Sequence, residues 1–168
     1  MKILIFGSKG MVGSSISRIL EQDSKYELIL SNREKTDLFN LNETKKLIKE
    51  IILIGVVTNA TRVGWNYVLD TQRFSFIIDN LKINMNILES CKPFSEIKVI
   101  NLGSSCIYPL NAPNPITEEQ FMNGKLEPTN SPYAMAKLSS IEIGNSMTME
   151  FGHEIINLMP TNLYGPHD

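Results

Sequence analysis

The chain has 168 residues, which is enough for one domain with a proper core and short for two. Its composition is 42% apolar and 20% charged, which is ordinary for a globular protein and excludes a disordered or fibrous chain. The formal net charge of −2, together with the lack of any Lys/Arg run, argues against a protein that binds nucleic acid.

The cysteine content and the hydropathy pattern bear on the compartment. Two cysteines, Cys91 and Cys106, are too few for a disulfide framework and favour a reducing environment. The apolar run at the N-terminus stops at Gly7, too early for a signal peptide, and no stretch approaches the roughly 20 apolar residues of a membrane span. We therefore expect a soluble cytoplasmic protein with no membrane partner and no metal site.

Apolar periodicity predicts the elements of the first part of the chain. In chain order they are a strand at 2–6, a helix carrying Val12, Ile16, Ile19 and Leu20, a strand at 27–30, a helix at 41–49 and a strand at 51–57.

The second part continues the alternation. A helix is expected at 74–91, where the apolar residues at helical spacing are Phe74, Ile77, Ile78, Leu81, Met85 and Leu88. A strand at 97–102 precedes a long polar stretch that contains four prolines and has no regular structure. The next helix should run over 131–151, with Ser131 as N-cap, Pro132 at the first helical position and Gly152 after the end. A last strand is expected at 154–158.

This alternation of strands and helices predicts the fold class. It is typical of an α/β domain with a doubly wound parallel sheet and right-handed crossovers, a Rossmann-like NAD(P)-binding domain that covers residues 1–168. Ligands on such sheets lie beyond the carboxyl ends of the strands. Gly7, Asn59, Ser104 and Asn162 follow predicted strands, so we expect them to meet in one crevice.

The loop after the first strand has the spacing of a dinucleotide-binding turn, Gly7-Ser8-Lys9-Gly10-Met11-Val12-Gly13. Gly7 permits a tight turn, Gly10 lets backbone N–H groups approach a pyrophosphate, and Gly13 permits close packing of helix on strand. The N-terminus of the following helix adds positive partial charge. The alternative is an ordinary glycine-rich turn, but the position directly after the first strand favours cofactor binding.

The end of the second strand favours NADP(H) over NAD(H). An acidic residue there would bind the ribose 2′-hydroxyl, but the sequence is Ser31-Asn32-Arg33. Arg33 and Lys9 would instead attract a 2′-phosphate, and Asp37 would contact the adenine edge. The alternative is that both cations are ordinary solvated surface charges.

Two further motifs predict reductase chemistry. Tyr133-Ala-Met-Ala-Lys137 places a phenol and an ammonium on one helix face, and a nearby cation favours ionisation of a tyrosine, whose free pKa is about 10. Ser104 and Ser105 follow the strand at 97–102, where a hydroxyl can polarise a substrate carbonyl. The alternatives are a packed tyrosine beside a solvated lysine, and a serine turn that caps a strand. Chemistry alone leaves the choice between the two serines open.

Four segments make the chain resemble the GDP-L-fucose synthase family of extended short-chain dehydrogenase/reductases. They are Gly103 to Pro109, Leu126 to Asn130, Tyr133 to Lys137 and Met159 to Asp168, and the resemblance extends to Gly10 to Gly13 and to Asn80 and Asn86. The resemblance implies epimerisation of GDP-4-keto-6-deoxy-D-mannose at C3 and C5, then reduction of C4 with NADPH. It implies a triad of Ser104, Tyr133 and Lys137, with Cys106 exchanging protons, although from its spacing alone Cys106 would be a small buried hydrophobe.

The complete prediction is thus an NADP(H)-dependent enzyme that acts on a GDP-sugar. The cofactor-binding residues are predicted to be Gly7, Lys9, Gly10, Met11, Val12, Gly13, Arg33, Asp37, Asn59, Ala60, Tyr133, Lys137, Pro160, Asn162 and Leu163. A homodimer formed through the helix at 74–91 and the Tyr133 helix is a further expectation by analogy with the family.

Three departures from the family pattern leave alternatives open. The family's epimerisation histidine lies beyond the last residues, and neither His153 nor His167 matches it. We expect the C-terminal substrate domain to be absent, which would leave an apolar sheet edge exposed and the fold weakly stable or oligomeric. Trp65-Asn66-Tyr67 replaces small residues in a substrate-facing loop. The alternatives are a 4-keto nucleotide-sugar reductase that does not epimerise, and a non-catalytic NADP(H)-binding module.

Overall fold

The computed structural model describes residues 1–50, 55–58, 60 and 71–165. Its centre is a sheet of five strands in the order β2-β1-β3-β4-β5, in which every neighbouring pair is parallel. The strands are β1 (Lys2–Phe6), β2 (Glu27–Ser31), β3 (Gly55–Thr58), β4 (Lys98–Leu102) and β5 (Ile155–Leu158). The predicted doubly wound parallel sheet is therefore confirmed.

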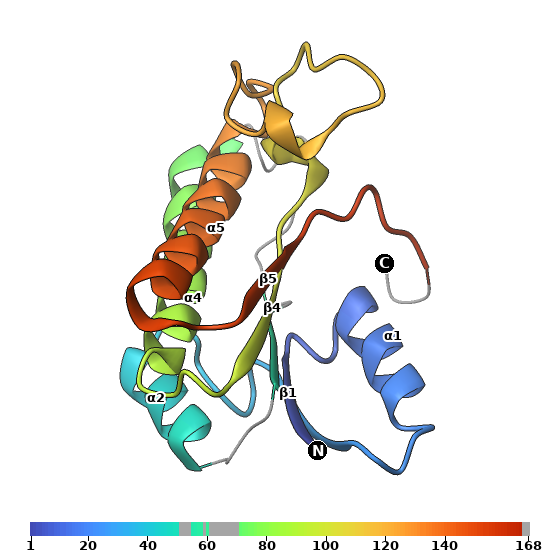
Figure 1. Cartoon of the computed structure of the whole chain (residues 1–168), viewed down its shortest axis with the longest axis vertical. Helices are drawn as coiled ribbons and strands as arrows, with labels where there is room; N and C mark the ends of the chain where they lie inside the picture. The colour runs from blue at the N-terminus through green and yellow to red at the C-terminus, as the bar shows by residue number, and fades with distance from the viewer. Residues whose placement is uncertain (51–54, 59, 61–70, 166–168) are drawn as a thin grey trace.

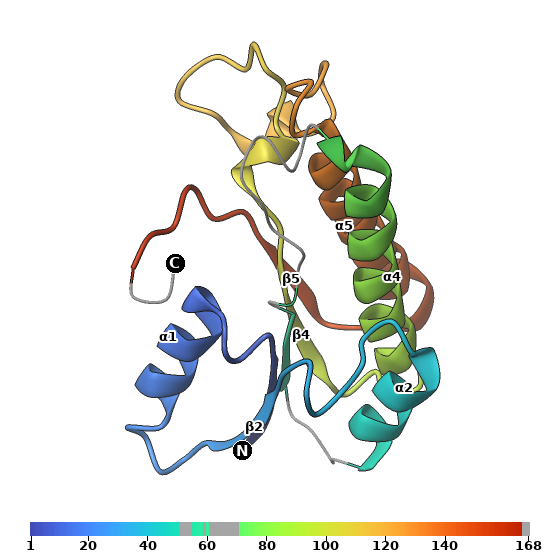
Figure 2. The same ribbon diagram turned by 180° about the vertical axis from the view of Figure 1, so that it is seen from behind.

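The helices cover both faces of this sheet. They are α1 (Met11–Leu20), α2 (Leu41–Glu50), α4 (Arg73–Cys91) and α5 (Ser131–Phe151), with short 3-10 helices η1 (Ser105–Ile107) and η2 (Glu118–Gln120) between β4 and α5. α2, α4 and α5 lie on one side of the strands and α1 on the other, as Figure 1 and the reverse view in Figure 2 show. In the described residues no helix is both long and apolar enough to span a membrane.

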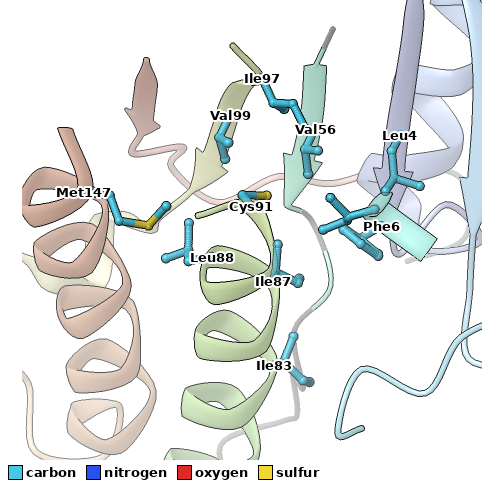
Figure 3. Packing of buried hydrophobic residues seen from close by; sticks show 11 residues of the cluster. Leu4, Phe6, Val56, Ile83, Ile87, Leu88, Cys91, Ile97, Val99 and Met147 are labelled. Carbon is cyan, nitrogen blue, oxygen red and sulfur yellow. The ribbon is translucent and has the colours of Figure 1, made fainter. Parts of the chain in front are cut away.

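The main core lies between the sheet and the layer of α2, α4 and α5 (Figure 3). Leu4 and Phe6 of β1 point into it because alternate residues of a strand face the same side. Ile87 and Leu88 of α4 meet them, and both are 1% exposed or less. A side chain of this size contributes roughly 1.5–3 kcal/mol when fully buried. This packing holds α4 and α5 against the sheet and so determines where their ends lie.

The buried side of α4 differs from the prediction. Of the six apolar residues that predicted this helix, only Leu88 is fully buried, whereas Phe74 is 77% exposed and Met85 48% exposed. The helix instead buries Phe76, Ile83 and Ile87. Apolar residues occur around most of its circumference, so spacing alone does not tell which stripe faces the sheet.

Of three predicted boundaries, one shifts in the structure, one falls outside the described residues and one is confirmed. Asn130, not Ser131, is the N-cap of α5, so that Pro132 lies one position further into the helix than predicted. β3 begins at Gly55, and residues 51–54 of the predicted strand lie outside the described residues. Gly152 does end α5 in the left-handed conformation, with φ of 73°.

β5 forms one edge of the described sheet, and its side chains are incompletely covered. Ile156 is 47% exposed and Leu158 45% exposed. These two apolar side chains of the edge strand are therefore partly open to solvent.

Candidate functional site

A cavity of about 890 Å³ lies at the carboxyl ends of the strands. Because all strands are parallel, the loops that follow them meet at this edge. The cavity is lined by fourteen predicted site residues: Gly7, Lys9, Gly10, Met11, Val12, Arg33, Asp37, Ala60, Ser104, Tyr133, Lys137, Pro160, Asn162 and Leu163. Its volume lies within the range of about 300–1,000 Å³ usual for cofactor sites.

The glycine loop between β1 and α1 has the backbone geometry that the spacing predicts. Gly7 has φ of 68°, and its carbonyl oxygen accepts a hydrogen bond of 3.0 Å from the Gly10 N–H. Gly13 does not line the cavity; a Cβ there would collide with the Gly7 carbonyl and lie 2.8 Å from the Ser8 Cα. Gly13 therefore lets α1 approach β1 closely, which brings the helix N-terminus to the cavity.

The first turn of α1 is suited to an anion. Gly10 is its N-cap and provides no side-chain cap, and no acidic residue occupies the turn. The first N–H groups of a helix have no partner within it, and they carry positive partial charge. Backbone donors in this turn are thus available to a phosphate group.

The loop after β2 holds an acidic residue, Glu34, that the sequence analysis did not assign to the site. The Lys9 ammonium lies 2.5 Å from a carboxylate oxygen of Glu34, and both side chains are largely exposed. The hydrogen bond and charge of Lys9 keep the pKa of Glu34 below its usual value. Lys9 is therefore partly neutralised, and Arg33 supplies the other positive charge at this end of the cavity. Glu34 could have been noticed as a carboxylate three residues beyond the end of β2.

Lys137 is deeply buried, which excludes the alternative of a solvated lysine. Its side chain is 2% exposed and its ammonium donates a 2.6 Å hydrogen bond to the Leu102 carbonyl oxygen at the end of β4. The same nitrogen lies 5.8 Å from the centre of the Tyr133 ring, one turn earlier on α5. Burial lowers the pKa of Lys137 from 10.5 to about 8, an effect that the neighbouring Cys106 partly opposes.

The two candidate serines differ in position. Ser104 lines the cavity with Tyr133 and Lys137, whereas Ser105 does not. The Ser104 hydroxyl also caps η1, accepting a 3.4 Å hydrogen bond from the Cys106 N–H. This position favours Ser104 for the predicted role at a substrate carbonyl.

Cys106 lies beside the cavity wall but does not line it. Burial raises the pKa of its thiol, although the Ser104 hydrogen bond and the Lys137 charge act in the opposite direction. The thiol is therefore the resting form, and its use as a base requires a change in its surroundings.

The remaining predicted residues fall into three groups. Pro160, Asn162 and Leu163 come from the segment after β5, which is tied to η1 by a 3.0 Å hydrogen bond from the Ser105 N–H to the Pro160 carbonyl. Asp37 lines the cavity in the loop after β2, and its carboxylate accepts a hydrogen bond from the Phe39 N–H. Asn59, the loop at 62–67 with Trp65, and His167 lie outside the described residues.

Other lining residues were missed because nothing in their spacing marks them. Among these is Phe39, an aromatic side chain that is 45% exposed in a polar turn. Within the part of the chain that the structure describes, no cluster of His, Cys, Asp and Glu could hold a metal ion.

Burial of the Lys137 ammonium makes stability depend on pH. Below pH 8 the lysine is protonated in both states and the folded state bears the full burial cost; from about pH 8 to 10.5 the unfolded state binds more protons. Relative to Lys137→Met, the free energy of unfolding should therefore rise across this window, by at most about 3 kcal/mol. Urea unfolding at several pH values measures this free energy, and Lys82→Met, a substitution at an exposed position, is the control. An equal, flat difference for both variants would contradict the buried ammonium.

Several known proteins share the fold and the sequence pattern of this chain. GDP-L-fucose synthase of Escherichia coli is 38% identical over 167 residues, and that of Sinorhizobium fredii is 40% identical. Each alignment covers 99% of this chain, but the chain spans about half the length of these relatives, 52% and 53%.

The structural comparison agrees with these relatives. GDP-mannoheptose C4 reductase from Campylobacter jejuni, solved with NADP bound, superposes with a TM-score of 0.91 at 30% identity, over 97% of this chain and 52% of that one. The family model described as NAD dependent epimerase/dehydratase matches residues 3–168. The cavity geometry, the whole-length match and the relatives together show that this chain belongs to the NAD-dependent epimerase/dehydratase family.

Proposed function

We propose that this chain carries the NADP(H) site and the proton-transfer residues of an oxidoreductase that reduces a 4-keto GDP-sugar. The observation that carries the proposal is that the glycine loop, Ser104, Tyr133 and Lys137 line the same cavity. The relatives act on GDP-sugars by name, and one solved relative holds NADP.

The residues present fit a dinucleotide. The uncapped N-terminus of α1 and the close approach that Gly13 permits suit the pyrophosphate, while Arg33 and Lys9 suit a 2′-phosphate. Tyr133 and Lys137 lie at the other end of the predicted binding path, where the nicotinamide ribose would be held. NADPH, when bound, supplies the hydride for reduction of the ketone.

The chain's own residues would supply the proton that the reduction requires. Tyr133 donates its phenolic proton to the oxygen of the substrate carbonyl as that oxygen becomes negative, and Ser104 orients the carbonyl by a hydrogen bond. The Lys137 ammonium stabilises the phenolate that remains, because it lies close to the ring and is screened from water.

Epimerisation at C3 and C5 before reduction is the activity that the fucose-synthase relatives suggest, with Cys106 as the proton-exchanging residue. Two observations favour the alternative of a reductase without epimerisation. Cys106 does not line the cavity, and its pKa is raised by burial. The identity of the product sugar separates these two proposals.

The proposed function is tested by titrating the protein with NADPH and NADH and then following NADPH oxidation with GDP-4-keto-6-deoxy-D-mannose. Tyr133→Phe should retain NADPH binding within a few-fold but lower the rate by about 10²–10⁴-fold, since the proton donor is lost. Tyr26→Phe, near the opposite edge of the sheet, is the matched control and should not change the rate. Nuclear magnetic resonance of the product shows whether C3 and C5 are inverted.

The outcomes of this experiment are distinct. Failure of the wild-type chain to bind NADPH would refute the cofactor proposal. Binding without turnover would favour the non-catalytic module, and turnover that Tyr133→Phe leaves unchanged would refute the role of Tyr133.

The Lys9–Glu34 pair predicts how cofactor preference can be changed. Glu34→Gln removes a carboxylate that neutralises Lys9 and repels a 2′-phosphate, so NADPH should bind more tightly, by about 2–5-fold because the pair is exposed. NADH affinity should change little. Glu154→Gln breaks a similar exposed pair with Lys98, at the amino end of the strands, and serves as the control in fluorescence titrations. An unchanged or weaker NADPH affinity in Glu34→Gln would show that Lys9 does not contact the phosphate.

We also propose that the chain forms a homodimer through the outer faces of α4 and α5, which lie side by side in both views (Figures 1 and 2). Both helices expose apolar side chains, among them Phe74 and Met85 on α4 and Met135 and Met149 on α5. Met149 is 88% exposed, so its side chain is available for contact with a second copy.

The dimer proposal predicts that Met149→Glu yields monomers, because a charge would be buried in the interface. Light scattering after size-exclusion chromatography measures the mass of each species. Met122→Glu, at a position 67% exposed between β4 and α5, is the matched control and should remain dimeric. A monomeric wild-type chain would contradict the proposal.

A further inference from the structure

We propose that Asn101, acting through Ser140, is a positioning residue that fixes α5 along the sheet and thereby places Lys137 at the site. This inference rests on the proposed function, because that proposal gives Lys137 its role in the site. Neither Asn101 nor Ser140 lines the cavity, so both act on it indirectly, through the position of Lys137.

Asn101 is the centre of a polar row across three strands. Thr58 of β3, Asn101 of β4 and Asn157 of β5 are in register, so their side chains lie side by side on one face of the sheet. The Thr58 hydroxyl donates to Asn101 Oδ1 at 2.9 Å, and Asn101 Nδ2 donates to Asn157 Oδ1 at 2.8 Å. Asn101 is only 1% exposed, so these bonds are shielded from water.

The row lies on the same face as the main apolar core. Val99, two residues before Asn101 on β4, is fully buried in that core. A buried amide costs free energy unless its polar atoms are paired. Because hydrogen bonds need a narrow geometry, a network of this kind adds to the apolar packing in specifying one position of the helix on the sheet.

Ser140 connects the row to α5. Its hydroxyl donates to the same Asn101 oxygen at 3.1 Å, and its side chain is 1% exposed. Lys137 lies one helical turn before Ser140, and its ammonium donates to the carbonyl of Leu102, the next residue of β4. Two consecutive residues of β4 therefore hold two consecutive turns of α5, one through a side chain and one through the backbone.

The close packing of the next turn makes the helix position exacting. A Cβ added at Gly144 would lie 3.2 Å from Ile155 Cγ2 and 3.6 Å from Asn157 Oδ1, so the helix backbone lies almost directly on β5. Hydrogen bonds weaken steeply once distances or angles leave a narrow range. A shift of about 1 Å in a catalytic group can cost as much as 10²-fold in rate. Loss of the Ser140 hydrogen bond would thus displace Lys137, which lies one turn earlier on α5.

The test compares Ser140→Ala with the wild type by following the titration of Lys137 in the cofactor-free chain. Lysine labelled with ¹³C at Cε is observed by nuclear magnetic resonance, and Lys137→Met identifies the signal. In the wild type Lys137 titrates near its lowered pKa of about 8; in Ser140→Ala the midpoint should move towards 10.5 as water reaches the ammonium. NADPH affinity should fall by about 3–10-fold, and Ser140→Thr, which restores a hydroxyl, should recover both values.

Two controls separate positioning from stability. Thr58→Val removes the other donor to the same Asn101 oxygen without touching α5, so it should lower the melting temperature as Ser140→Ala does while Lys137 titrates as in the wild type. Ser139→Ala makes the same substitution at the neighbouring residue, whose hydroxyl donates only within its own helix, to the Met135 carbonyl. It should change neither property.

The inference is overturned if Ser140→Ala folds and Lys137 titrates as in the wild type, or if Thr58→Val moves the titration equally. If Ser140→Ala does not fold, Ser140→Cys gives the same comparison, because a thiol keeps the volume but is a weak donor. The titration needs no cofactor, so a wild-type chain that fails to bind NADPH refutes the proposed function while this comparison still decides the role of Ser140.

Discussion

Parallel pairing of the strands is the constraint on which the rest of the structure depends. With all neighbours parallel in the order β2-β1-β3-β4-β5, each strand delivers its carboxyl end to the same edge. The glycine loop after β1, the charged loop after β2 and the serine turn after β4 therefore meet although up to about a hundred residues separate them in the chain. Between one parallel strand and the next, the chain must return to the amino ends of the strands through a crossover connection. The helices α2, α4 and α5 are three of these crossovers (Figure 1).

Within this frame, burial of one charge gives the candidate site its chemical character. Lys137 lines the cavity but is only 2% exposed, and its ammonium donates a hydrogen bond to the backbone carbonyl of Leu102 in β4. A cation kept in such a place has a lowered pKa and a strong field on the adjacent Tyr133 ring. Burying this charge costs free energy, which the packing of the helical layer must offset. The stability of the fold and the chemistry of the site are therefore coupled.

The opposite end of the cavity has a different character, because its charges are exposed and exchange partners easily. Lys9 and Glu34 pair across two loops, and solvent screens both. The rigid part of that end is the backbone, since Gly7 and Gly13 fix how closely α1 approaches β1. We infer that the phosphates of the proposed cofactor are placed by backbone geometry, while side chains adjust the preference for one cofactor over another.

The sequence by itself determined the fold class, the glycine loop and the pairing of Tyr133 with Lys137. These depend on local rules: an apolar run of strand length, glycines at fixed offsets, and helical residues four apart. Boundaries were less well determined, as the shift of the N-cap to Asn130 illustrates, because neighbouring polar residues can serve equally as caps.

Only the tertiary structure decided which stripe of α4 is buried, whether Lys137 is solvated, and which of the two serines faces the cavity. It also revealed the Lys9–Glu34 pair and the row of Thr58, Asn101 and Asn157. The physical reason is the same in each case. Burial and hydrogen bonding between distant segments depend on how strands and helices are placed against one another, and periodicity within one element does not contain that information.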